Sequence, residues 1–232
     1  MDEINKPLNE SDTAEVKRSV TLFSKEFLIA MCAFICLMAF FTLVKVILID
    51  ENKVFDQEIY ALIEPHTNDT TSRIMVIASW IGGTQFMLPA NMLLICYFLF
   101  VRKNRWQSIK FGVIALSSVC MMHLLKLLFN RPRPLIPLLE PAHGLSFPSG
   151  HAMTSITFFG LFIYLTASHV KNVFLRVFLI VLLLSFILTI GYSRVYLRVH
   201  YPSDVLAGYC MGTVWLIFCL WTLKKFERKE RT

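Results

Sequence analysis

The 232-residue chain is 56% hydrophobic and has a mean hydropathy of +0.59, so it carries more apolar surface than one soluble domain of this length can bury. Its net charge of +7 could indicate a nucleic-acid partner, but the basic residues are spread over short segments between apolar runs. The composition therefore favours a membrane protein whose partner is the lipid bilayer, and it disfavours nucleic-acid binding.

Six apolar runs are long enough to cross roughly 30 Å of hydrocarbon as helices. In chain order they are Phe27–Ile49, Thr84–Val101, Ile109–Phe129, Ala152–Ser168, Val173–Tyr192 and Val205–Leu223. The expected fold is all-α, a polytopic bundle of six transmembrane helices. We expect a polar cytoplasmic tail over residues 1–24, one membrane domain over 25–223 and a basic cytoplasmic tail over 224–232.

The segments between the spans predict smaller elements. Helical apolar spacing over Val54–Glu64 and Ile74–Ile81 predicts short interfacial helices, and Gly82-Gly83 marks the start of the second span. The proline-rich stretch from Arg131 to Pro148 predicts an ordered, non-helical loop that caps a site.

The distribution of basic residues predicts the orientation. Fifteen Lys and Arg residues fall on the side of the two termini in a six-span layout, against seven on the other side. Because cytoplasmic loops carry the excess of Lys and Arg, we expect both termini in the cytoplasm of a multi-pass protein of the bacterial inner membrane. Loops 50–72, 130–151 and 193–204 then face outward.

Three segments at the predicted outer ends of spans carry residues that are costly near a bilayer unless they serve a site. They are Lys126 with Arg133-Pro134, then Pro148-Ser149-Gly150-His151, and then Ser193-Arg194 with His200 and Asp204. Their grouping on one membrane side predicts a single site.

The cations of these segments suit a phosphoryl group. Lys126, Arg133 and Arg194 could surround its non-bridging oxygens, since arginine forks match phosphate. Ser149 could cap a helix while the N–H groups around Gly150 face the anion. The alternative for any single arginine is contact with lipid headgroups, and we prefer that interpretation for Arg131 and Arg198.

The full pattern reads K-x6-R-P, P-S-G-H and S-R-x5-H-x3-D over residues 126–204. It resembles the signature of the type-2 phosphatidic acid phosphatase superfamily, which includes bacterial lipid phosphatases and vanadium-dependent haloperoxidases. The resemblance implies their helical core, His200 as the nucleophile on phosphorus and His151 as the acid that protonates the leaving oxygen. Asp204, four residues after His200, could then fix its tautomer and stabilise the phosphohistidine.

Several alternatives stay open at this stage. A metal site of His151, His200 and Asp204 is disfavoured because the surrounding cations would repel a divalent ion, so we expect no metal and no cofactor. His123 and His143 receive no role. The family resemblance implies lipid substrates of the phosphatidylglycerol phosphate, undecaprenyl pyrophosphate, phosphatidic acid or lipid A class. A lipid-to-lipid phosphotransferase and a non-catalytic phosphate-lipid binder or transporter are the competing functions.

Overall fold

The computed structural model describes residues 10–134, 136–139 and 143–231. Within these ranges the regular structure is entirely helical, and six helices are long and apolar enough to cross a membrane. These spans are Lys25–Ile49, Thr84–Val101, Arg105–Phe129, Gly150–His169, Val173–Tyr196 and Pro202–Glu230. The predicted all-α fold with six transmembrane helices is confirmed.

The described part of the chain contains eight α-helices. They are α1 (Glu10–Leu43), α2 (Val54–Ile63), α3 (Asp69–Gly82), α4 (Thr84–Cys96), α5 (Arg105–Phe129), α6 (Gly150–His169), α7 (Val173–Tyr196) and α8 (Pro202–Arg231). Short π-helical segments, Val44–Ile49 and Tyr97–Val101, continue α1 and α4 to the length of a span.

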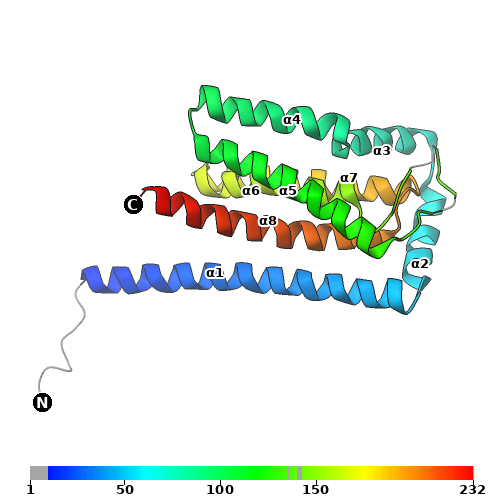
Figure 1. Cartoon of the computed structure of the whole chain (residues 1–232), viewed down its shortest axis with the longest axis horizontal. Coiled ribbons are helices and arrows are strands. Elements are labelled where there is room, and N and C mark those ends of the chain that lie inside the picture. Colours follow the sequence, from blue (N-terminus) through cyan, green and yellow to red (C-terminus); the bar gives the residue numbers. More distant parts are fainter. Residues whose placement is uncertain (1–9, 135, 140–142, 232) are drawn as a thin grey trace, which may run out of the picture.

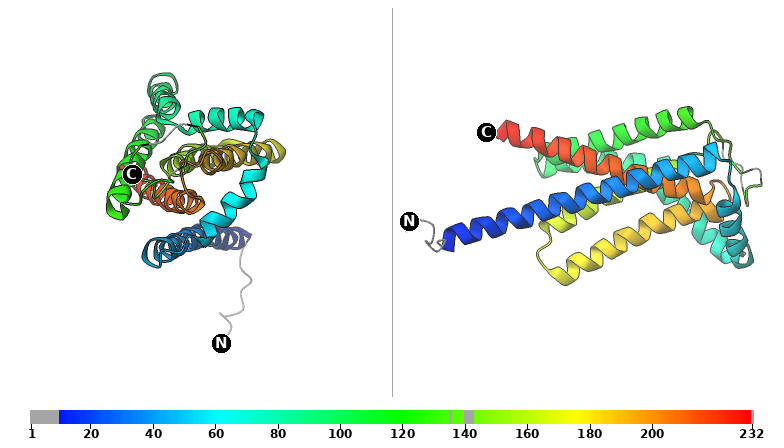
Figure 2. Two further views of the ribbon diagram at one scale, coloured as in Figure 1. Left: turned by 90° about the vertical axis from the view of Figure 1, so that its right-hand side faces the viewer. Right: turned by 90° about the horizontal axis from the view of Figure 1, so that it is seen from below.

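The long helices run side by side, while α2 crosses one end of the bundle (Figure 1). Helix α6 lies inside the bundle and packs against α5, α7 and α8, whereas α1 packs against α8 (Figure 2). Helices α2 and α3 lie at the end opposite to the one where α8 finishes (Figure 1). One end of the bundle is thus covered by short helices and loops.

Helix ends differ from the predicted spans in places. Helix α1 already begins at Glu10 and α8 continues to Arg231, because the flanking Lys, Arg and Glu residues are good helix formers. Of the predicted polar tail, residues 1–9 lie outside the described residues. Helix α7 extends to Tyr196 and α8 begins at Pro202, where proline suits a first helical position, so the predicted loop 193–204 shrinks to residues 197–201.

Local capping explains the other boundaries at this end. Helix α5 stops at Asn130, which adopts a left-handed conformation with φ 46°, and the following prolines keep the described part of the loop to residue 149 non-helical, as predicted. Helix α3 is longer than predicted because the Asn68 side chain accepts a 2.9 Å hydrogen bond from the Thr71 N–H and caps it.

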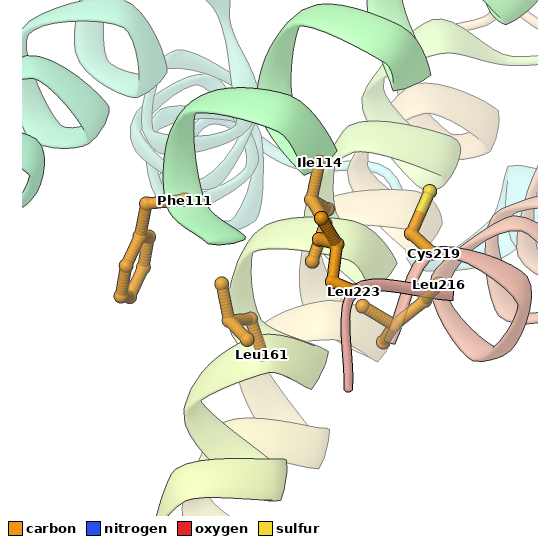
Figure 3. Close-up of a cluster of buried hydrophobic side chains, with 6 residues drawn as sticks. All are labelled: Phe111, Ile114, Leu161, Leu216, Cys219 and Leu223. Carbon is orange, nitrogen blue, oxygen red and sulfur yellow. The ribbon is translucent and has the colours of Figure 1, made fainter. Parts of the chain in front are cut away.

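The buried core lies along α5, α6 and α8. One cluster joins Phe111, Ile114, Leu161, Leu216, Cys219 and Leu223 (Figure 3). Outside this core, large apolar side chains on α1 and α7 stay exposed, as expected for surfaces that face lipid.

Helices α6 and α8 cross closely because α8 presents Gly208 and Gly212 one turn apart, a small-residue pattern typical of tight membrane helix pairs. A methyl group on Gly208 would lie 2.6 Å from the Ser149 carbonyl oxygen and 2.9 Å from Ala152 Cβ. A methyl group on Gly212 would lie 3.0 Å from the Met153 carbonyl oxygen. The crossing therefore tolerates no side chain at Gly208.

We expect Gly208→Ala to destabilise the protein by about 1–3 kcal/mol, since the added methyl meets backbone that cannot move aside. The matched control is Gly112→Ala, where the nearest atom is Ile95 Cδ1 at 3.7 Å. Thermal unfolding in detergent measures both. An equal unfolding midpoint for the two variants would contradict the close crossing.

Candidate active site

Every predicted site residue comes to the end of the bundle that carries α2 and α3. Lys126 lies in the last turn of α5 and Arg133 in the loop that follows. Ser149, Gly150 and His151 form the start of α6. Arg194 lies in the last turn of α7, His200 in the short connection and Asp204 in the first turn of α8.

A pocket of about 430 Å³ lies between these elements, and Lys126, Arg133, Gly150, His151 and His200 all line it. Among the described residues, no Asp or Glu lines this pocket. The pocket therefore offers the positive charge of Lys126 and Arg133 and four histidines, His123, His143, His151 and His200, to whatever enters it.

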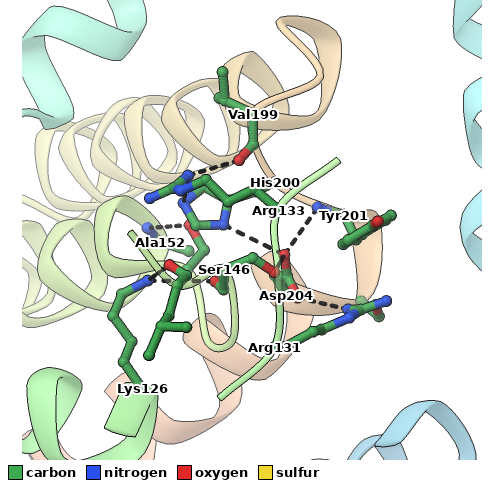
Figure 4. Close-up of polar contacts among 12 residues, drawn as sticks. Lys126, Arg131, Arg133, Ser146, Ala152, Val199, His200, Tyr201 and Asp204 are labelled. Carbon is green, nitrogen blue, oxygen red and sulfur yellow. Dashed lines mark hydrogen bonds and ion pairs between the residues drawn. The ribbon is translucent and has the colours of Figure 1, made fainter. Parts of the chain in front are cut away.

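His200 is held between an acceptor and a donor (Figure 4). Its Nδ1 lies 3.3 Å from Asp204 Oδ2, and its Nε2 lies 3.1 Å from Arg133 Nη1. Because a guanidinium only donates hydrogen bonds, Nε2 must accept, which places the proton on Nδ1 facing the carboxylate. The arrangement thus selects one tautomer, with the Nε2 lone pair facing the pocket.

His200 is 1% exposed, and its surroundings disfavour the protonated ring. Burial, together with the positive charges of Arg133 and Arg194, lowers the pKa of His200 to about 4, and Asp204 only partly opposes this shift. The imidazole is therefore neutral at physiological pH, as a nucleophile must be.

The Asp204 carboxylate is fully buried and accepts four hydrogen bonds. Oδ1 accepts from Arg131 Nη1 at 2.6 Å, and Oδ2 accepts from the Ser146 hydroxyl at 2.8 Å and the Tyr201 N–H at 2.9 Å, in addition to His200. A carboxylate with donors on both of its oxygens is fixed in orientation.

The two pocket-lining cations are positioned by backbone carbonyl groups. Lys126 Nζ donates to the carbonyl oxygens of Leu145 and Ser146. Arg133 Nη1 donates to Val199 O at 2.7 Å, and its Nε donates to His143 O and Gly144 O, each at 3.1 Å. Burial lowers the pKa of Arg133 because it disfavours the charged guanidinium. An anion in the pocket would stabilise that charge more than the neutral carbonyl groups do.

Arg194 lies close enough to act on the pKa of His200, but it does not line the pocket itself. Its Nη1 donates to the Ser79 hydroxyl of α3, and its Nε is buried with no partner among the described residues. An unsatisfied buried donor of this kind needs an explanation, and an acceptor in the site would supply one.

Ser149 and His151 occupy different environments at the start of α6. The Ser149 side chain is fully buried and caps the helix by accepting from Ala152 N, while its own N–H donates 2.9 Å to Asp204 O. His151 packs against the α3–α4 junction, where a methyl group on Gly82 would lie 3.2 Å from its Cδ2. Ser149 thus ties the motif to Asp204, and Gly82 makes room for the second imidazole.

The headgroup interpretation of Arg131 is wrong. Arg131 is only 9% exposed and pairs with the carboxylates of Asp204 and of Asp56 in α2. These two residues lie 73 and 75 positions away from Arg131 in the sequence. Sequence reasoning also missed Asp56, Ser146 and Ser79 as residues of this site.

Arg198, the other arginine expected to contact headgroups, is half-buried and pairs with Glu64 at 3.5 Å.

The two remaining histidines of the pocket, His123 and His143, line it together with His151 and His200. His143 is exposed and offers its backbone carbonyl to Arg133, as described above. His123 is exposed too and lies at the pocket rim.

An apolar groove of about 460 Å³ adjoins the pocket between α4, α5 and α6. It shares four lining residues with the pocket, Met122, His123, Gly150 and His151. Toward the middle of the spans its walls are mostly apolar and include Met92, Ala115 and Phe158. A charged pocket thus opens into a hydrophobic groove.

The chain is similar to known membrane phosphatases. The model of the PAP2 superfamily matches residues 107–228. The chain is 28% identical over 159 residues to phosphatidylglycerophosphatase B of Bacillus subtilis (strain 168), which covers 68% of this chain and 76% of that protein. It is 29% identical over 175 residues to undecaprenyl-diphosphatase of Sulfolobus acidocaldarius, covering 73% of this chain and 78% of that protein.

Two solved structures share the fold. The transmembrane PAP2 type phosphatidylglycerolphosphate phosphatase from Bacillus subtilis superimposes with a TM-score of 0.73 at 23% identity, covering 85% of this chain and 96% of that one. Aquifex aeolicus LpxE superimposes with a TM-score of 0.59 at 26% identity, covering 74% and 98%. The chain belongs to the type-2 phosphatidic acid phosphatase (PAP2) superfamily and is a multi-pass membrane protein of its lipid phosphatase group.

Proposed function

We propose that the protein hydrolyses a lipid phosphate or pyrophosphate through a phosphohistidine on His200, without a metal or other cofactor. The observation that carries the proposal is the His200 geometry, in which Asp204 holds the Nδ1 proton and leaves the Nε2 lone pair facing a cationic pocket.

The first half-reaction transfers the phosphoryl group to the protein. His200 Nε2 attacks phosphorus, the bond from phosphorus to the leaving oxygen breaks, and His151 donates a proton to that oxygen. Asp204 stabilises the imidazolium that forms on His200.

The second half-reaction restores the protein. His151 removes a proton from water, the water oxygen attacks phosphorus, and the phosphorus–nitrogen bond breaks to release inorganic phosphate. In both steps Lys126, Arg133 and Arg194, together with the N–H groups near Gly150, would stabilise charge on the equatorial oxygens.

The displacement needs no metal because the protein's own groups supply the charge and the proton transfers. The Asp204 carboxylate already accepts from three donors on Oδ2 and from Arg131 on Oδ1, which makes it a poor ligand for a divalent ion. The cations that line the pocket also repel such an ion.

The groove supports a lipid substrate of the phosphatidylglycerol phosphate, undecaprenyl pyrophosphate, phosphatidic acid or lipid A class. A lipid could place its phosphate beside His200 while one apolar chain lies along Ala115 and Phe158. A water-soluble phosphate ester would leave this apolar surface unused.

We expect His200→Ala to lower kcat for phosphate release by at least about a thousandfold while lipid phosphate binding persists, because only the nucleophile is lost. The measurement is inorganic phosphate released from a panel of lipid phosphates in detergent. His169→Ala, an exposed histidine at the far end of α6, is the matched control.

Other outcomes of the same assay would contradict the proposal. Turnover that survives His200→Ala removes the phosphohistidine mechanism, and strong inhibition by EDTA restores a metal-dependent one. Wild-type protein that labels a second lipid without releasing phosphate is a phosphotransferase, and one that binds lipid phosphate without turnover is a binder.

We expect Ala115→Phe to raise KM for a long-chain lipid phosphate about tenfold or more but to leave a short-chain analogue nearly unaffected, because the ring fills the groove and not the pocket. Val113→Phe, an exposed position on the same helix outside the groove, is the control. Equal effects on both substrates would contradict the groove as the chain site.

We also propose that the site faces outward and that both chain ends, including the tails 1–24 and 224–232, lie in the cytoplasm of a bacterium. The site lies at the opposite end of the bundle from the basic end of α8, and positive residues favour the cytoplasmic side. A reporter that works only in the cytoplasm should be active when it is fused to the carboxyl terminus, and one that works only on the outer side should be inactive there. Activity only on the outer side would reverse the orientation.

A further inference from the structure

Asp56 is the least expected buried charge in the protein. It lies in the first turn of α2, outside the three motifs, and only 2% of its side chain is exposed. Its Oδ2 accepts 2.8 Å hydrogen bonds from Arg131 Nη2 and from the Ser203 hydroxyl, and its Oδ1 accepts from Ser203 N at 2.9 Å. A buried carboxylate with such partners is costly to keep unless it serves the structure or the site.

Arg131 bridges this carboxylate to Asp204. Nη2 binds Asp56, Nη1 binds both Asp204 at 2.6 Å and Ser203 Oγ at 2.9 Å, and the guanidinium stacks 4.0 Å from the centre of the Tyr201 ring. It approaches Asp204 from the side away from His200 (Figure 4). Both Nη groups of Arg131 are therefore bonded to side chains other than His200.

Helix α2 touches the nucleophile segment at a second point. Tyr60 lies one turn after Asp56, on the same face of α2, and its hydroxyl donates 2.9 Å to the His200 carbonyl oxygen. The helix thus holds the main chain of His200 through Tyr60 and reaches the far side of Asp204 through Asp56 and Arg131.

The charges of this network sum to one negative charge behind His200, since Asp56 and Asp204 are opposed by a single Arg131. Lys126 and Arg133 act from the pocket side, and Arg194 acts on His200 from α7. An imidazolium on His200 therefore depends on the rear network for its stabilisation, because every nearby cation disfavours it.

We propose that Asp56 and Arg131 are positioning residues of the active site, which orient Asp204 and set the net charge that stabilises the phosphohistidine. This inference rests on the proposed function but assigns roles to two residues outside the motifs. Asp56 takes up part of the Arg131 charge, so that Asp204 keeps enough negative potential to hold the Nδ1 proton of His200.

Charged and titratable groups surround His200 and its pocket on several elements. They are Asp56 and Tyr60 from α2, His123 and Lys126 from α5, Arg131, Arg133 and His143 from the outer loop, His151 from α6, Arg194 from α7, and Tyr201 and Asp204 from its own segment. Of these, the test changes only Asp56 and Arg131.

The experiment compares Asp56→Asn, Arg131→Met and the double variant, with Glu58→Gln on the exposed face of α2 as the control. Removing Asp56 raises the net charge of the network by one, removing Arg131 lowers it by one, and the double variant restores the wild-type sum. Rates are expressed per active site, counted as the fraction of protein that binds a non-hydrolysable lipid phosphate analogue.

We expect Asp56→Asn to lower kcat by about 10- to 100-fold with KM changed less than about threefold, because the pocket cations stay in place. The acid limb of kcat/KM should lie near pH 4 in the wild type, where His200 gains its proton. It should move by about one pH unit to lower pH in Asp56→Asn and to higher pH in Arg131→Met, and return in the double variant.

A purely structural role gives a different result. Fewer active sites with an unchanged rate per site and an unmoved acid limb would overturn the inference, as would Asp56→Asn behaving like Glu58→Gln. If Arg131→Met does not fold, Asp56→Asn and the double variant still carry the comparison.

The proposed function can fail separately. Wild-type turnover that does not depend on His200 removes the function itself. Turnover that depends on His200 but not on Asp56 removes only the network.

Discussion

The bond between Asp204 and His200 is the interaction on which the rest of the site depends. A neutral imidazole has one N–H, and whichever nitrogen carries it cannot attack phosphorus. By accepting from Nδ1 at 3.3 Å, Asp204 leaves the lone pair of Nε2 on the pocket side, where it faces Arg133. Arg133, which can only donate to Nε2, selects the same tautomer from the pocket side.

The fold serves this bond by bringing distant segments to one end of the bundle. Asp204 lies at the start of α8, and the Ser149 N–H at the start of α6 donates to its backbone carbonyl. The close crossing at Gly208 keeps these two helix starts together. Membrane helices give rigid supports, so the site can be built from helix ends and short connections.

Charge is arranged in two layers around His200. In front, Lys126 and Arg133 line a pocket without a carboxylate among its described residues, which suits an anionic substrate and disfavours a protonated His200. Behind, Asp204 is anchored by Arg131, which in turn is paired with Asp56. The front layer suits phosphate binding, and in the proposed mechanism the rear layer would support the positive charge that phosphoryl transfer places on the ring.

The sequence predicted the six spans because apolar runs of bilayer length are a strong signal, and it predicted the motif residues because their spacing is specific. Helix ends were less predictable, since residues 10–24 and 224–231 are polar but still good helix formers. Arg131 was misinterpreted and Asp56 missed because pairing across 75 residues leaves no local pattern. The adjoining groove, too, arises only when α4, α5 and α6 pack together.

The most direct test of the account is to identify the phosphorylated atom. Protein labelled with nitrogen-15 histidine and quenched in base during turnover would be examined by phosphorus and nitrogen nuclear magnetic resonance, with the modified residue assigned by mass spectrometry. The account predicts phosphorus bonded to Nε2 of His200. Phosphorus on Nδ1, on His151, or on no histidine would contradict it.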